Sequence, residues 1–163
     1  MTPHDENLPD ASTSPFEFAL IALDLVDNEA FEIDKDVTID PASLEGGFSL
    51  EYELGADMRF VLTHDQNSRR FVATAGTAQP VQDIARLHLA LTMNSQMPAH
   101  RRFAMNPVSQ CLELSQWWPV EGLVLSDFAV GIRYLIHAMQ AFGAPLTPLT
   151  PPERDVSLFH LKV

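Results

Sequence analysis

Three consecutive segments in the first half of the chain alternate apolar and polar residues, and this alternation constrains the fold most strongly. Residues 46–54 read GGFSLEYEL, and residues 58–64 and 69–75 follow as MRFVLTH and RRFVATA. A period of two is typical of strands with one buried face. The sequence DQNS between the last two segments has the composition of a hairpin turn. These residues therefore predict an antiparallel sheet that begins with three adjacent strands.

Segments with helical spacing lie on both sides of these strands. A first helix is predicted after Ser14, because Pro15 suits the first helical position. Residues 84–97 read IARLHLALTMNSQM and residues 125–143 read LSDFAVGIRYLIHAMQAFG, both typical of helices, and a second hairpin around residues 106–107 lies between them. The element order α-β-β-β-α-β-β-α predicts an α+β fold, a twisted antiparallel sheet with three helices.

Composition fits one soluble domain. The chain has 163 residues, of which 46% are hydrophobic and 20% charged, and no apolar run approaches the roughly 20 residues that span a bilayer. We expect residues 1–13 to form a mobile acidic tail, residues 14–143 the α+β domain and residues 144–163 a Pro-rich C-terminal tail. The polar N-terminus is unlike a secretory signal, and one cysteine, Cys111, forms no internal disulfide. A reducing cytoplasm is the expected location.

The charge is strongly acidic and unevenly distributed. The formal net charge is −12, and residues 1–65 hold 16 of the 22 acidic residues against two basic ones, Lys35 and Arg59. Such a protein repels phosphate backbones, which argues against nucleic-acid binding. The acidic half is either a solvated surface or a field that keeps a protein soluble while it handles a sticky or basic partner.

One acidic stretch, residues 34–45, comes close to a calcium-binding loop. The template needs Gly at its sixth position for a sharp turn, and Ile39 stands there instead. The segment that follows reads as a strand, whereas the calcium motif needs a helix. We therefore expect an acidic loop without calcium. The residues at the ligand positions of the template are Asp34, Asp36, Thr38, Asp40 and Glu45.

Side chains that could carry chemistry do not form a catalytic or metal-binding pattern. The six histidines lack the paired spacing of metal sites, and Cys111 alternates with leucines as a small packed residue does. Residues 117–119, Trp-Trp-Pro, are either a ligand box or a strand end closed over the core, and we favour the second reading. We expect no enzyme activity, no metal and no cofactor.

Two helices carry more apolar surface than one contact can bury. The middle helix is apolar on two or three sides, and the first helix has one apolar face of Phe16, Leu20 and Leu23 that suits the sheet. A second face of the first helix has no obvious partner within the chain and is a candidate binding surface. The alternative is that the acidic loop or the Pro-rich tail covers it. This second face contains Phe18, Ala22 and Leu25.

The chain resembles a known family, in its second half by motif and in its first half by element order. ARLHLALTMNS and RRFAMNPVSQCLELSQWWPVEGLVLSDFAVGIRYLIHAM are similar in apolar spacing to the class I type III secretion chaperones, the Tir-chaperone or CesT-like family. The likeness covers roughly residues 14–143. It rests on a leucine-rich helix that ends near Asn94, a strand with Phe103, a Leu-x-Leu strand and a Pro119–Val120 link to the last helix.

The resemblance implies a function without chemistry. Members are homodimers, and Leu87, His88, Ala90 and Leu91 are the implied residues of the dimer seam. The chaperone holds the N-terminal region of a virulence effector extended and secretion-competent in the bacterial cytoplasm and offers it to the secretion ATPase. The implied groove lies between the first helix and the sheet, with Phe48 and Leu50 beside the helix residues. A regulatory module that binds a folded partner, or a small-ligand-binding or enzymatic α+β domain, are the alternatives.

Overall fold

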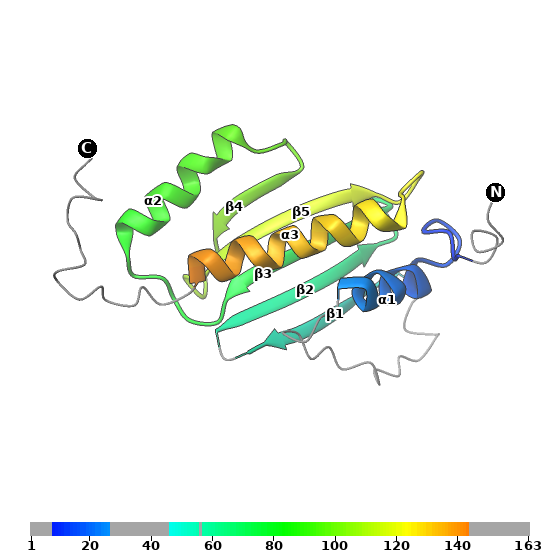
Figure 1. Cartoon of the computed structure of the whole chain (residues 1–163), viewed down its shortest axis with the longest axis horizontal. Helices are drawn as coiled ribbons and strands as arrows, with labels where there is room; N and C mark the ends of the chain where they lie inside the picture. Colours follow the sequence, from blue (N-terminus) through cyan, green and yellow to red (C-terminus); the bar gives the residue numbers. More distant parts are fainter. Residues whose placement is uncertain (1–7, 27–45, 56, 144–163) are drawn as a thin grey trace.

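A computed structural model describes residues 8–26, 46–55 and 57–143 of the chain. The element order is α-β-β-β-α-β-β-α, as predicted, with one short 3-10 turn after the second helix. Figure 1 shows two helices lying across the sheet and a third beside it. The elements are α1 (Pro15–Val26), β1 (Gly47–Leu54), β2 (Met58–Asp65), β3 (Arg70–Thr77), α2 (Ile84–Met93), η2 (Asn94–Gln96), β4 (Arg101–Met105), β5 (Leu112–Pro119) and α3 (Leu125–Gly143).

The five strands form one antiparallel sheet in the order β1-β2-β3-β5-β4. The first three strands are joined by tight turns, so each pairs with its neighbour in sequence. β5 then pairs with β3, and β4 returns to the outside. The outer strands of the sheet are therefore β1 and β4, and each has one side that no strand of this sheet pairs with.

The core lies between one face of the sheet and two helices. α3 runs along β3 and β5, and α1 packs beside α3 near β1 and β2 (Figure 1). Strand residues alternate as predicted: in β1 every second side chain is buried, and the residues between are exposed. Four aromatic rings meet at the centre, where Phe71 contacts Phe18 of α1, Phe128 of α3 and Phe48 of β1.

One glycine sets the approach of α3 to the sheet. A Cβ placed on Gly131 would stand 2.5 Å from Cζ2 of Trp118, which is buried on β5. The helix therefore lies closer to β5 than any larger residue allows. Trp118 in turn meets Phe128 edge-on, with ring centroids 4.8 Å apart. α3 begins at Leu125, so Ser126 lies in its first turn and not at the N-cap position that its residue type suggests.

Part of the segment predicted as an N-terminal tail is packed against the domain. Residues 11–13 form a turn in which the Asp10 carboxylate accepts the Ser12 backbone N–H at 2.7 Å. Ala11 is buried with the core residues. Residues 34–45, with the calcium-loop resemblance, lie outside the described residues, as does the Pro-rich segment 144–163.

Candidate functional site

The face of the sheet opposite α1 and α3 is polar, and we call it the open face. Its side chains are exposed or half-buried in the described chain. This composition follows from strand alternation, because every second side chain of each strand points into the core, and most of these side chains are apolar. The open face contains Ser49, Glu51, Glu53, Arg59, Val61, Thr63, Val72, Thr74, Gly76, Glu113, Ser115 and Trp117.

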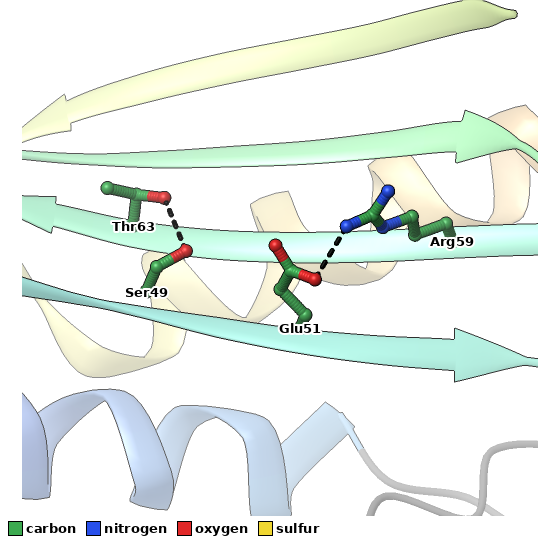
Figure 2. A network of polar contacts seen from close by, with 4 residues as sticks. All are labelled: Ser49, Glu51, Arg59 and Thr63. Atoms are coloured by element: carbon green, nitrogen blue, oxygen red, sulfur yellow. Dashed lines mark hydrogen bonds and ion pairs between the residues drawn. The ribbon is translucent and has the colours of Figure 1, made fainter. Parts of the chain in front are cut away.

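Cross-strand polar pairs organise the open face. The Ser49 and Thr63 hydroxyls lie 3.2 Å apart, and the Arg59 guanidinium binds the Glu51 carboxylate (Figure 2). Further along the sheet, the hydroxyl of Thr74 lies 2.8 Å from that of Ser115. These pairs hold the side chains in a fixed pattern, each contributing a fraction of a kcal/mol up to about 1 kcal/mol.

A hollow of about 810 Å³ opens on this face near the β1–β2 turn. Gly76 on β3 lies at the floor of the hollow and has no side chain to fill it. The Glu113 side chain uses this space, because its Cγ lies 3.3 Å from the position that a Cβ of residue 76 would occupy. The Asn106 amide donates to the Glu113 carboxylate at 3.0 Å. Glu51 and Glu53 also line the hollow. A glycine within a strand often marks such a close approach. Gly76 directly follows the predicted third strand, and the structure includes it in β3.

The two outer edges of the sheet differ. On β4 the side chain of Asn94 binds both backbone groups of Phe103: its amide donates to the carbonyl at 2.8 Å and its oxygen accepts the N–H at 2.6 Å. A side-chain amide thus occupies the place of a neighbouring strand. Among the described residues, β1 has no comparable cover along its outer edge. Within residues 8–26, 46–55 and 57–143, β1 is therefore the outer strand that no other segment covers.

α2 lies beside the sheet (Figure 1). Several of its large apolar side chains are exposed in the described part of the single chain. Ile84 is 80% exposed and Leu91 46% exposed, and the two are seven residues apart, so they share one side of the helix with exposed His88. Of the residues predicted for a dimer seam, Leu87 is half-buried against the core and Ala90 is fully buried within the chain. Ala90 therefore does not reach the exposed surface.

The prediction that Phe18 and Ala22 lack a partner within the chain is wrong. Both are buried, because α3 lies against α1 and Phe18 stacks on both Phe71 and Phe128. Leu25 is 49% exposed, and its carbonyl accepts a hydrogen bond from Arg133 of α3 at 2.7 Å. The face predicted to meet the sheet, with Phe16 and Leu20, is only half-buried apart from buried Leu23.

Phe48 and Leu50, the strand residues predicted to line an effector groove, are buried on the core face of β1. Phe48 touches Phe16 of α1, with ring centroids 5.3 Å apart. The structure thus brings Phe18 and Phe48 into one aromatic cluster around Phe71, beneath the surface of the single chain. Contact of these residues with an effector stays a prediction.

A buried histidine belongs to the same cluster. His64 on β2 stacks on Phe48 at 5.4 Å between ring centroids and lies 5.2 Å from Phe71. Burial disfavours the charged imidazolium and lowers the pKa of His64, while the neighbouring Asp65 carboxylate acts in the opposite direction. The pKa of Asp65 is itself lowered, chiefly because the Ser68 hydroxyl donates to its carboxylate. At neutral pH this arrangement favours the uncharged ring.

The remaining sequence candidates fall into structural positions. Trp117 and Trp118 both belong to β5 and point to opposite faces of the sheet. Trp118 points into the core, and Trp117 lies under the Arg70 guanidinium on the open face. Cys111 is half-buried beside the hollow. Within the described ranges no group of three or more metal-ligating side chains occurs. No helix there is long and apolar enough to cross a membrane.

Comparison with solved structures places the fold. One chain of the ExsC–ExsE complex superposes with a TM-score of 0.52 at 13% identity, covering 66% of this chain and 78% of that one. One chain of the HopA1–SchA chaperone–effector complex superposes with a TM-score of 0.53 at 18% identity, covering 78% of this chain and 94% of that one. The fold is shared with both. The sequence matches no protein-family model and no curated protein.

Proposed function

We propose that this chain is a bacterial type III secretion chaperone of the class I kind. It binds the N-terminal region of an effector and keeps that region extended and secretion-competent in the cytoplasm. The fold shared with a chain of a chaperone–effector complex supports the proposal.

The observation that carries the proposal is the difference between the two sheet edges. Asn94 closes β4 at Phe103, whereas β1 has eight residues along an outer edge. Exposed strand edges pair with extended peptides through main-chain hydrogen bonds, which suits a client without a fold of its own. An effector segment added at β1 would also lie near Phe16 of α1, which is half-buried against Phe48.

A homodimer through α2 completes the proposal. Ile84, Leu89 and Leu91 are large apolar side chains left exposed on this helix in the single chain. Burying such residues against a second copy is favourable by about 25 cal/mol for each Å² of apolar surface. Two copies would present two β1 edges, so that one client chain could cross both. The loaded complex would then be passed to the secretion ATPase.

Co-purification from a bacterium that carries the system, followed by mass identification and limited proteolysis, tests the function. We expect one effector, with its N-terminal region bound and its remaining domains independent. Hydrogen exchange should then show new protection along β1. A folded regulator bound at α2, or a bound metabolite in the hollow, would replace the proposal with one of the two alternatives.

A further inference from the structure

The strand at the open edge has two chemically different sides. Core-facing residues of β1 are apolar, and the residues between them, Ser49, Glu51 and Glu53, face the open side. A strand paired with β1 would send alternate side chains to the same two sides, where they would meet these residues as cross-strand neighbours. The apolar residues of β1 are Phe48, Leu50, Tyr52 and Leu54.

The two glutamates are not equally engaged. The register places Arg59 of β2 directly opposite Glu53, but its guanidinium binds the carboxylate of Glu51. Glu53 is exposed and has no ion pair within the described chain. Glu51 and Glu53 thus carry two negative charges against one positive charge, and the unmatched carboxylate stands beside the open edge.

Charge also argues against occupants from the chain itself. A second copy of β1 paired at this edge would bring its own Glu51 and Glu53 close to the same residues, and like charges across strands are unfavourable. Residues 27–45, which lead into β1, carry seven acidic residues and one basic residue, Lys35. The acidic edge therefore disfavours self-pairing and favours a partner of opposite charge.

We propose that β1 selects an extended peptide in which apolar residues alternate with lysine or arginine, the basic ones facing Glu51 and Glu53. This specificity rests on the proposed function, because it describes the client strand at that same edge. The apolar residues of the peptide lie toward the α1 side of the sheet and the basic ones toward the open face. The acidic edge thus determines which side chains of the peptide face the open face and which face the α1 side.

Three synthetic peptides test the alternation directly. Each peptide has ten residues, in which an apolar residue, valine or leucine, alternates with one polar residue type. The polar residue is lysine in the first peptide, threonine in the second and glutamate in the third, and proline flanks each sequence to limit self-pairing. Fluorescence anisotropy with the full chain should show the lysine peptide binding about threefold to tenfold more tightly than the threonine peptide, and the glutamate peptide most weakly. Raising the salt concentration should narrow these differences.

Two charge-reversal variants distinguish the effect of charge at the β1 edge from the effect of the overall negative charge on peptide binding. Glu53→Lys should weaken binding of the lysine peptide about tenfold and strengthen binding of the glutamate peptide. Glu113→Lys changes the net charge equally on the same face, but β2 and β3 separate it from β1, which places it beyond a Debye length of about 8 Å. Glu113→Lys should change the affinity for the lysine peptide by less than about twofold.

The outcomes distinguish this inference from the function on which it rests. If the threonine and lysine peptides bind equally well, the charge rule fails while pairing at β1 stands. If Glu53→Lys and Glu113→Lys weaken binding of the lysine peptide equally, the charge rule also fails, because the overall charge would then explain the preference for lysine. If none of the peptides binds at millimolar concentration, pairing at β1 fails together with the rule.

Discussion

The side chain of Asn94 forms two hydrogen bonds with the backbone of Phe103, one to the carbonyl at 2.8 Å and one from the N–H at 2.6 Å. It follows α2 directly, in the 3-10 turn η2, and so ties this helix to the outer strand β4. One residue thereby fixes the position of α2 and closes one edge of the sheet. Among the described residues, the outer edge of β1 has no such contact.

Replacement of Asn94 by leucine, which is similar in size, should destabilise the fold. Two partly buried backbone groups of Phe103 would lose their partners, at a cost of about 2 kcal/mol. Urea unfolding followed by circular dichroism measures the change. Ser95→Ala is the control, because that hydroxyl binds an exposed carbonyl of Thr92 and should matter by less than about 0.5 kcal/mol. Equal stability of the two variants would contradict the role of Asn94.

The stability of the wild type should fall as the pH drops through the ordinary histidine range. Because the folded state lowers the pKa of His64, the unfolded chain binds the proton more readily. The stabilisation is therefore complete above the unfolded pKa near 6.5 and is lost as the pH falls from there toward the lower folded pKa. Chemical unfolding at intervals between pH 7.5 and 5.5 measures the loss.

His64→Phe isolates this contribution, since it keeps an aromatic ring between Phe48 and Phe71 but does not titrate. The variant should lose less stability over the same pH interval than the wild type. The prediction is wrong if His64→Phe and the wild type show the same pH dependence.

Gly131→Ala should destabilise the chain although alanine favours helices. The intrinsic gain of about 1 kcal/mol is opposed by a methyl group placed 2.5 Å from Cζ2 of Trp118, and overpacking of this kind costs about 1–3 kcal/mol. Trp118→Phe removes the atom that the methyl group meets. Thermal unfolding of the single and double variants should therefore show coupling, with Gly131→Ala less harmful in the phenylalanine background. Additive effects would show that the close approach is not the cause.

Ile84→Asp together with Leu91→Asp should dissociate the proposed dimer without unfolding the chain. Both side chains are exposed in the single chain, so the charges are tolerated in the monomer but are costly in a desolvated contact. Sedimentation velocity at micromolar concentration measures the oligomeric state of each variant. Val108→Asp, in the exposed turn before β5, is the control and should remain dimeric. A monomeric wild type at this concentration would remove the prediction.

Local sequence patterns were sufficient for the strands and helices. Alternation in residues 47–54 predicted which side of β1 is buried, because a strand sends successive side chains to opposite faces whatever its neighbours are. Helical spacing predicted α3 over residues 125–143. The element order that follows identified the α+β fold. These properties depend on backbone geometry within a few residues.

The exposed surfaces were decided by contacts between distant segments. The first helix is apolar on more than one side, and only the approach of α3, permitted by Gly131, buries Phe18 and leaves Leu25 exposed. The cover at the outer edge of β4 likewise depends on a tertiary contact, from the Asn94 side chain to the backbone of Phe103. The sequence by itself determined the period of each element and hence the fold. For the part of the chain that the structure describes, the tertiary structure decided which apolar face and which strand edge stay uncovered, because burial depends on packing partners that no local pattern specifies.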